Sequence, residues 1–403
     1  MPYDFASAMR RAVQSVRARD LTGATQIIQD ALAGRGSAPA PHDPPTVAEP
    51  HPTGPVIDQD GNPVDPAAGE PHAAASSASP DRPSSSDRLR KPLHEAIRIL
   101  REVRPPGRTS LRGRASPSLV IPDGAQFLNR LFSCPAGSRD YKVYIPSGAR
   151  TQVRGLIVML HGCKQNPDDF ARGTNMNAIA DAYNVVVAYP GQSDIANALS
   201  CWNWFNPADQ ARGAGEPAIL AGITTELMRE FRIDHQRVFV AGLSAGAAMA
   251  VVLGETYPDL FAGVAAHSGL PYRVANDVVS AFAAMRGERS PPATSGSSVG
   301  SPARLIVFQG SADQTVHAGN ADQIVAAARI SHRNLKTAKS TGKEGGRSYS
   351  KTIFTAADGN VAIEYWLIAG AGHAWFGGQP GGSYTDPFGP HASREIMRFF
   401  LSS

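Results

Sequence analysis

The chain has 403 residues, of which 42% are hydrophobic, and a net charge of +4, so it is long enough for one large catalytic domain with additional segments. Much of the basic excess lies in an Arg- and Pro-containing stretch without interleaved aromatic residues, which argues against a nucleic-acid partner. No apolar run approaches the roughly 18 residues of a membrane span, and three cysteines are too few for a disulfide framework.

The N-terminal part of the chain is predicted to contain little folded structure. Residues 1–34 have the apolar spacing of two short helices, which predicts a helical hairpin that packs on the main domain or on a partner. Residues 35–92 are rich in Pro, Ala and Ser and lack large apolar side chains, so they predict a disordered linker. Residues 93–124 predict one short helix followed by a basic linker.

Residues 125–403 alternate strand-like apolar runs with helical patterns. Several of the runs are continuously apolar, as in parallel strands that helices bury on both faces. The runs are GLIVMLHG, NVVVAYPG, RVFVAGLS, FAGVAAHSG, RLIVFQGS and VAIEYWLIAG. The predicted fold class is therefore α/β, with a mostly parallel sheet. A polar insertion over residues 286–303 interrupts the pattern.

A Gly-x-Ser-x-Gly sequence places Ser244 between an apolar strand-like run and an Ala-rich helical pattern. The flanking Gly242 and Gly246 allow a tight strand-to-helix turn, because they have no Cβ to clash. A second match around Ser298 lies inside the polar insertion and has neither a strand before it nor a helix after it. Strand, turn and helix together predict that Ser244 is an exposed nucleophile; a helix N-cap serine is the alternative.

A nucleophilic serine requires a base to take its proton and a carboxylate to orient that base. In α/β-hydrolases the acid and then the histidine follow the nucleophile along the chain. Asp313 follows the run RLIVFQG, and His373 follows YWLI in a Gly-rich loop, so both have the expected order and position. His161 and His267 also follow strand-like runs, but they precede Asp313, and we expect His161 to order the loop after it.

The tetrahedral intermediate of acyl transfer requires backbone N–H donors for its negative oxygen. One predicted donor is the amide of Ala245, directly after the nucleophile. We assign the second to the amide of Cys163, in the sequence HGC that follows the run GLIVML.

From about Arg139 to the C-terminus, the chain resembles the short-chain polyhydroxyalkanoate (PHB) depolymerase-like esterases of the α/β-hydrolase superfamily, which are related to feruloyl and acetyl xylan esterases. The matching pieces occur in order: GSRDYKVYIP, VMLHGCKQNPDDFA, VAYPGQ, CWNWF, RVFVAGLSAGAAM, GSADQTV, AGAGHAWFGG and SYTDPFGP. The resemblance implies the α/β-hydrolase fold, and it implies that Ser244, Asp313 and His373 form the catalytic triad.

The resemblance also implies a disulfide and a set of substrate-binding residues. By the family pairing, Cys163 bridges Cys201, a bond that a reducing cytosol would oppose. Trp202, Trp204 and Trp375 are expected to line the substrate groove, with packing in the core as the alternative for each.

Partners and location are less constrained. Secreted depolymerases of this kind carry a signal peptide and a substrate-binding domain after the catalytic domain. No signal peptide is visible here, which predicts a cytoplasmic location, whereas the family is mostly extracellular. The expected partner is an ester substrate, either small, oligomeric or polymeric, and the N-terminal hairpin is expected to reach a polymer granule or another protein.

The leading hypothesis is a serine carboxylic-ester hydrolase that cleaves hydroxyalkanoate oligomers or other short-chain acyl esters through an acyl-enzyme. Feruloyl or acetyl xylan esterase activity is the alternative within the family, and a serine peptidase is a rival on the same fold. A non-catalytic hydrolase-like binding scaffold represents another class. No cofactor is expected, because the chain lacks Cys/His metal-ligand spacing and a dinucleotide fingerprint.

Overall fold

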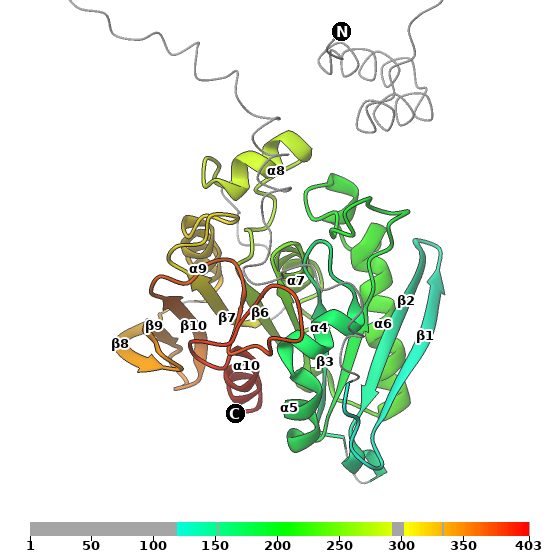
Figure 1. Cartoon of the computed structure of the whole chain (residues 1–403). Helices are drawn as coiled ribbons and strands as arrows, with labels where there is room; N and C mark the ends of the chain where they lie inside the picture. The colour runs from blue at the N-terminus through cyan, green and yellow to red at the C-terminus, as the bar shows by residue number, and fades with distance from the viewer. Residues whose placement is uncertain (1–118, 151–152, 292–301, 333, 403) are drawn as a thin grey trace, which may run out of the picture. The chain divides into compact units, whose positions relative to one another are not determined.

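The computed structural model describes residues 119–150, 153–291, 302–332 and 334–402 (Figure 1). The predicted hairpin at 1–34, the linker at 35–92 and most of the segment 93–124 lie outside the described residues. The middle of the polar insertion, residues 292–301, also lies outside them. Within the described residues, no helix is both long and apolar enough to cross a membrane.

The described residues form one large sheet, one two-stranded pairing and the helices that pack on them. The strands are β1 (Gln126–Cys134), β2 (Gly137–Ile145), β3 (Gly155–Leu160), β4 (Val185–Pro190), β5 (Val238–Leu243), β6 (Gly263–His267), β7 (Arg304–Gly310), β8 (Lys336–Glu344), β9 (Arg347–Thr355), β10 (Val361–Ile368), β11 (Trp375–Phe376) and β12 (Thr385–Asp386). The α-helices are α4 (Pro167–Thr174), α5 (Met176–Tyr183), α6 (Gly215–Phe231), α7 (Ala245–Thr256), α8 (Val278–Met285), α9 (Gly319–Ser331) and α10 (Ala392–Leu401). Short 3-10 helices are η2 (Ser147–Arg150), η3 (Pro207–Asp209) and η4 (His235–Arg237).

The large sheet has the strand order β1-β2-β4-β3-β5-β6-β7-β10-β9-β8. The six central strands, β4 to β10 in this order, pair in parallel, and the outer strands at both ends pair antiparallel. Helices cover both faces, as parallel strands require: α6, α7, α8 and α9 contribute to the core on one face, and α4, α5 and α10 to the core on the other. The predicted α/β class with a mostly parallel sheet is confirmed.

The central strands are fully buried, which explains their continuous apolar sequences; all six residues of β3, of β4 and of β5 are buried. The outer hairpins differ, because β8 is almost entirely exposed and rich in Lys and Thr. Its sequence therefore lacks the apolar pattern by which the inner strands are recognised. A lysine-bearing strand is a common means of protecting a sheet edge from pairing with other chains.

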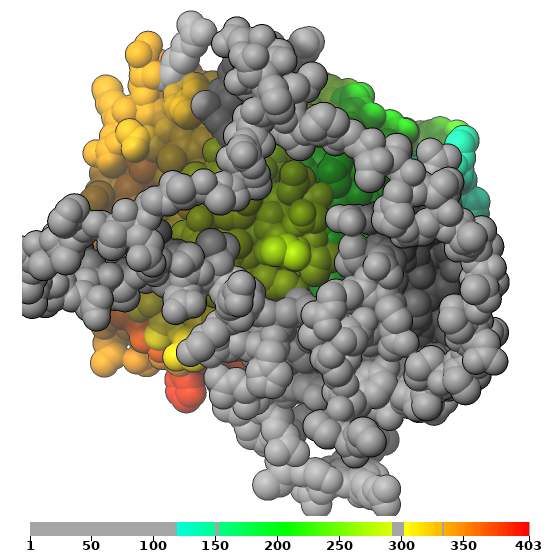
Figure 2. All heavy atoms as spheres, turned by 90° about the horizontal axis from the view of Figure 1, so that it is seen from above, coloured from blue at the N-terminus to red at the C-terminus, as the bar shows by residue number. Residues whose placement is uncertain are grey.

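The parallel strands end at one common edge, which lies at the top in Figure 1. The loops that follow β3, β5, β7 and β10 therefore gather at this edge. Figure 2 views the molecule from this side, and among the coloured residues the yellow-green α8 region lies near the middle while the orange β8–β9 hairpin lies at the margin. Functional residues in folds of this kind are found at the carboxyl edge of the sheet.

Candidate active site

Ser244 lies between the end of β5 and the start of α7, in a backbone conformation with φ 57° and ψ −120°. A positive φ is unfavourable for a serine, and such strain is typical of functional turns. Two close approaches hold it: a Cβ on Gly242 would clash with the backbone of Gly246, and a Cβ on Gly246 would clash with the Leu160 carbonyl. The Ser244 side chain makes no capping hydrogen bond, which argues against the N-cap alternative.

Asp313 and His373 form a direct pair. Asp313 follows β7 by three residues and His373 follows β10 by five, and the distance between Asp313 Oδ2 and His373 Nδ1 is 2.8 Å. The other carboxylate oxygen of Asp313 accepts the backbone N–H groups of Thr315 and Val316, each at 2.9 Å. Because β7 and β10 are adjacent parallel strands, the fold brings together two side chains separated by 60 positions.

The charge state of Asp313 follows from these contacts. Burial by itself would raise the pKa of this carboxyl group. The electrostatic interaction and hydrogen bond with His373, together with the hydrogen bonds from the Val316 and Thr315 amides, outweigh burial and hold the pKa of Asp313 below its ordinary value. Asp313 is therefore an anion at neutral pH, so His373 Nδ1 donates a proton to it and Nε2 is the nitrogen left to act as a base.

The loop after β3 lies beside Ser244. A Cβ on Gly162 would be 3.6 Å from the Ser244 Cβ. His161 is fully buried and accepts the Gln192 N–H at Nε2, at 3.0 Å, so its proton is on Nδ1 and is donated to the Gly162 carbonyl at 2.8 Å. In a trans peptide the C=O and N–H point in opposite directions, so this bond directs the Cys163 N–H away from the His161 ring. The expected role of His161 in ordering the loop agrees with these contacts.

The backbone amides of Cys163, in the loop after β3, and of Ala245, the first residue of α7, have no acceptor among the described residues. An N–H in the first turn of a helix has no intrahelical acceptor and is available to an anionic oxygen. Both amides could therefore act as the oxyanion donors predicted from the sequence, and that role stays a prediction.

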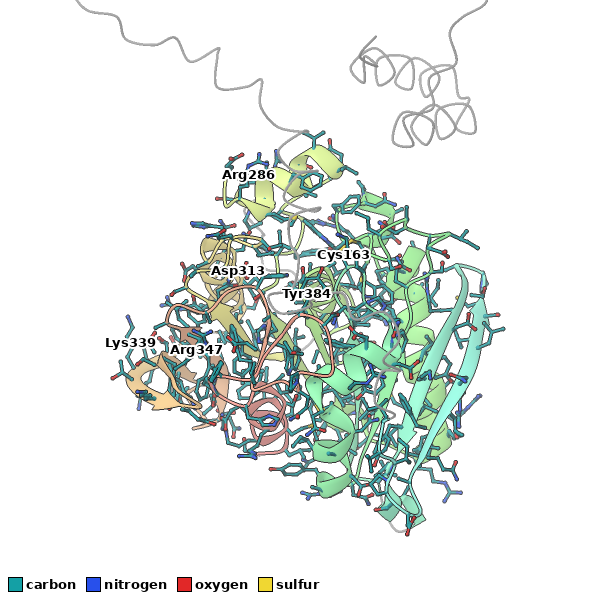
Figure 3. All side chains as sticks on the ribbon, viewed as in Figure 1. Cys163, Arg286, Asp313, Lys339, Arg347 and Tyr384 are labelled. Atoms are coloured by element: carbon teal, nitrogen blue, oxygen red, sulfur yellow. A yellow bond between two sulfur atoms is a disulfide. The ribbon has the colours of Figure 1, made fainter. Side chains whose placement is uncertain are left out.

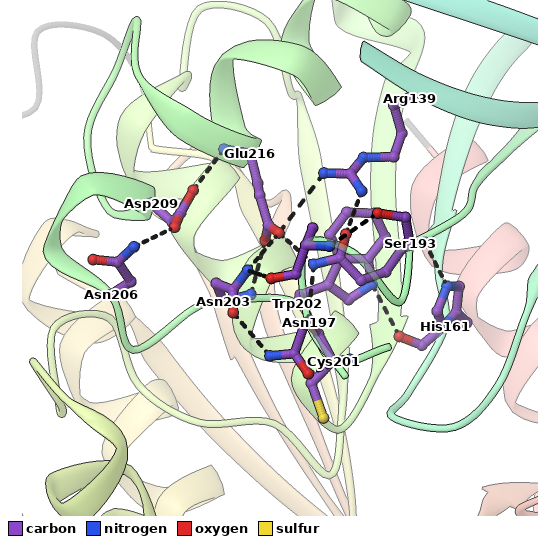
Figure 4. Close-up of polar contacts among 12 residues, drawn as sticks. Arg139, His161, Ser193, Asn197, Cys201, Trp202, Asn203, Asn206, Asp209 and Glu216 are labelled. Atoms are coloured by element: carbon purple, nitrogen blue, oxygen red, sulfur yellow. Dashed lines mark hydrogen bonds and ion pairs between the residues drawn. The ribbon is translucent and has the colours of Figure 1, made fainter. Parts of the chain in front are cut away.

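A disulfide joins Cys163 to Cys201, with 4.3 Å between the Cα atoms. A buried polar cluster is hydrogen-bonded to the backbone of Cys201 (Figure 4). Gln192 Nε2 donates to the Cys201 carbonyl at 2.9 Å and also to Glu216, while Arg139 donates to Gln192. The loop that carries Cys163 is thus fixed both by the covalent bond and by a satisfied polar network.

The three tryptophans expected at the substrate groove are nearly inaccessible: Trp202, Trp204 and Trp375 are 0%, 6% and 1% exposed. The indole N–H of Trp202 donates to the His161 carbonyl at 3.1 Å, and that of Trp375 donates to Ser393 at 3.1 Å. These contacts satisfy the polar atom of each ring inside the protein. For Trp202 and Trp375, burial therefore favours the core-packing alternative over a substrate-lining role, because a side chain with almost no exposed surface offers none to a ligand. The role of Trp204 at the groove stays a prediction.

His267, at the end of β6, connects the loops that carry Ser244 and His373. Its carbonyl accepts the Ser244 N–H at 2.9 Å, and its ring Nε2 accepts the Phe376 N–H at 3.2 Å. The ring lies between Phe308 and Trp375, with centroid distances of 5.6 and 5.0 Å. The sequence discounted His267 as a base because of its chain order, and its contacts assign it a structural role instead.

The two buried histidines predict acid sensitivity. Burial lowers the pKa of His161 to about 4 and that of His267 to about 3, whereas an unfolded chain binds protons near the ordinary value of about 6.5. The unfolded state therefore takes up protons first, and the stability present above pH 6.5 is lost as the pH falls toward these values, by up to about 1.4 kcal/mol per pH unit for each histidine. We expect His267→Gln to flatten the dependence of the free energy of unfolding on pH between 6.5 and 5, as measured by urea denaturation.

The control is His235→Gln, because the His235 side chain is 63% exposed and this variant measures the effect of removing an exposed histidine. Glutamine retains an acceptor for the Phe376 N–H, and comparing slopes cancels the other titrating groups. Equal slopes for wild type and His267→Gln would contradict the prediction.

A second polar cluster connects the loop after β3 to the loop that precedes β12. Gln165 accepts the Gly162 N–H at 2.9 Å and donates to the Ser383 carbonyl at 3.0 Å. Asp169, in α4, accepts the Ser383 N–H at 3.0 Å and its hydroxyl. No local sequence pattern singles out these residues, although their segments KQNPDDFA and SYTDPFGP belong to the pieces that carry the family resemblance.

Ser244 and the Asp313–His373 pair thus lie at the same sheet edge. Among the described residues, no hydrogen bond joins Ser244 to His373. Figure 3 shows Tyr384 between Asp313 and Cys163 in projection, with Lys339 of β8 at the margin of the molecule.

The sequence profile described as esterase PHB depolymerase matches residues 139–343, just over half of the chain. The chain belongs to this family. The matched segment includes Ser244, Asp313 and Cys163, whereas His373 follows it.

Individual relatives of the chain are named as depolymerases and esterases. Poly(3-hydroxyalkanoate) depolymerase C from Paucimonas lemoignei is 32% identical, over 60% of the chain and 60% of the relative. Poly(3-hydroxybutyrate) depolymerase from Ralstonia pickettii is 30% identical, over 57% of the chain and 49% of the relative. The chain thus spans only about half to three-fifths of these two proteins. Feruloyl esterase B from Neurospora crassa is 28% identical, over 60% of the chain and 85% of the relative.

Among solved structures, an acetyl xylan esterase from Aspergillus awamori superposes with a TM-score of 0.52 and 21% identity, covering 68% of this chain and 98% of that one. This similarity supports the fold, which is that of the α/β-hydrolase-type esterases.

Proposed function

We propose that the chain is a serine carboxylic-ester hydrolase. Ser244 attacks the ester carbonyl, His373 takes its proton, and Asp313 holds the imidazole in the required tautomer. The Asp313–His373 hydrogen bond of 2.8 Å, at the same sheet edge as the strained Ser244 turn, carries this proposal. Family membership and relatives named as esterases and depolymerases support it.

The reaction proceeds through an acyl-enzyme. Ser244 Oγ adds to the carbonyl carbon while its proton passes to His373 Nε2, and the Cys163 and Ala245 amides stabilise the negative oxygen of the tetrahedral intermediate. The intermediate collapses when His373 returns the proton to the leaving alcohol, which leaves the acyl group on Ser244. Water, deprotonated by the same histidine, then releases the acid and restores the serine.

We assign hydroxyalkanoate oligomers or other short-chain acyl esters as the substrate class, because the two depolymerases have the highest identities among the relatives named above. Feruloyl or acetyl xylan esterase activity is the second candidate. It is favoured by the 85% of feruloyl esterase B that the chain spans and by the structural similarity to an acetyl xylan esterase.

A substrate panel tests both the reaction and the substrate class. We expect the purified full chain to hydrolyse p-nitrophenyl butyrate, and to cleave 3-hydroxybutyrate oligomers with a higher kcat/KM than methyl ferulate or acetylated xylan. The matched butyryl anilide should be hydrolysed far more slowly, which distinguishes an esterase from a peptidase. Equal turnover of ester and anilide would contradict the esterase assignment, and lack of turnover of every ester would favour a binding scaffold.

A further inference from the structure

Tyr384 is one of the described non-glycine residues at this edge with a positive φ and no role assigned above. Tyr384 has φ 51°, a left-handed conformation that is rare for a bulky aromatic residue. Such strain persists only where the surroundings determine the backbone, and it is concentrated at ligand-binding and catalytic sites. The segments on both sides of Tyr384 hold its backbone in this conformation.

The preceding residue, Ser383, is held by Asp169 and Gln165 through the hydrogen bonds described above. The carbonyl of Tyr384 accepts the Trp375 N–H at 2.8 Å, and the following residues form β12, which pairs with β11. Gln165 also holds the Gly162 N–H, so one polar cluster fixes both the backbone of Tyr384 and the loop of the proposed oxyanion donor.

The Tyr384 ring stands edge-on to the imidazole of His373, with 6.5 Å between centroids and 79° between planes. The residue is half-buried, and its hydroxyl makes no hydrogen bond to any described residue. The hydroxyl oxygen is not among the fully inaccessible polar atoms that lack a partner. The phenol oxygen is therefore not fully buried, and its hydroxyl is available to a ligand. Burial and the negative charge of Asp169 raise the pKa of Tyr384 above its ordinary value, so the hydroxyl remains protonated and able to donate.

The position beside His373 determines which part of a substrate the phenol meets. In the proposed function, on which this inference rests, His373 protonates the leaving alcohol, so the alcohol part of the ester must lie against the imidazole. A side chain that flanks the imidazole then flanks the leaving group. We propose that Tyr384 is a specificity-determining residue whose hydroxyl donates a hydrogen bond to an oxygen carried by the alcohol part of the substrate, as in a hydroxyacyl oligomer.

Two butyrate esters with the same acyl group test this proposal. In one the alcohol is ethyl 3-hydroxybutyrate, which carries a carbonyl oxygen beyond the scissile bond; in the other it is 2-heptanol, which carries none. We expect Tyr384→Phe to lower kcat/KM for the first ester about 5- to 10-fold, the effect of one lost hydrogen bond, and to change the second less than about 2-fold. The phenylalanine ring keeps the packing against His373, so a purely structural role would affect both esters alike.

The control is Tyr349→Phe, on β9, whose ring packs on Trp366 at 4.9 Å and which should leave both values unchanged. An unchanged ratio of the two kcat/KM values in Tyr384→Phe, with both esters hydrolysed by wild type, would overturn this inference alone. Failure of the wild-type protein to hydrolyse either ester would overturn the proposed function and this inference with it.

Discussion

Replacing Ser244 with alanine is expected to lower kcat/KM for p-nitrophenyl butyrate by about 10⁴- to 10⁶-fold, since loss of the nucleophile removes covalent catalysis altogether. The variant should fold normally. The Ser244 side chain makes no capping hydrogen bond, and alanine is smaller than serine, so the substitution removes no cap and introduces no steric clash. The residual rate would come from substrate binding and from the Cys163 and Ala245 amides.

Covalent labelling provides an independent measurement of the same prediction. A fluorophosphonate probe should label wild type stoichiometrically and should not label Ser244→Ala. Ser298→Ala is the matched control, because Ser298 is the other serine in a Gly-x-Ser-x-Gly sequence, and this variant should be labelled like wild type. Labelling that persists in Ser244→Ala, or that disappears in Ser298→Ala, would refute the assignment of the nucleophile.

Replacing Asp313 with asparagine should have the second largest effect. Asparagine has almost the same shape, but its amide N–H₂ can donate to His373 Nδ1, which places the imidazole proton on Nε2. His373 then cannot accept the serine proton, and we expect kcat to fall by about 10³- to 10⁴-fold with little change in KM. Steady-state kinetics on p-nitrophenyl butyrate measures both constants.

Asp259→Asn serves as the control for Asp313→Asn, because Asp259 forms an exposed ion pair with Arg212 away from the site. Its kcat should remain within about 2-fold of wild type. The Asp313 variant should retain far-UV circular dichroism and cooperative unfolding, so that the loss of activity is assigned to the tautomer. A kcat above about one-tenth of wild type would mean that Asp313 does not orient the base.

Much of the fold could be predicted from the sequence, because it depends on local patterns. Fully buried parallel strands require continuously apolar runs, and these mark β3 to β7. The edge strands β8 and β9 escaped prediction for the opposite reason. Water replaces apolar neighbours on an exposed strand, so its sequence needs no apolar pattern.

Some residues of the candidate site could also be predicted from the sequence, and others could not. Ser244 is marked by local geometry, since glycines are needed where backbones approach closely, and the expected chain order singles out Asp313 and His373. The burial of Trp202 and Trp375 could not be predicted, because an aromatic residue has the same sequence signature in a groove and in a core.

What the sequence by itself determined is therefore the α/β class, the strand-turn-helix around Ser244 and the order of the three proposed catalytic residues. Only the tertiary structure brought Asp313 to 2.8 Å from His373 and connected Gly162 to Ser383 through Gln165. It also placed Tyr384 edge-on to His373. The physical reason is that these contacts join side chains far apart in sequence, and the pairing of strands and docking of loops sets their distances, for which no local pattern carries a signal.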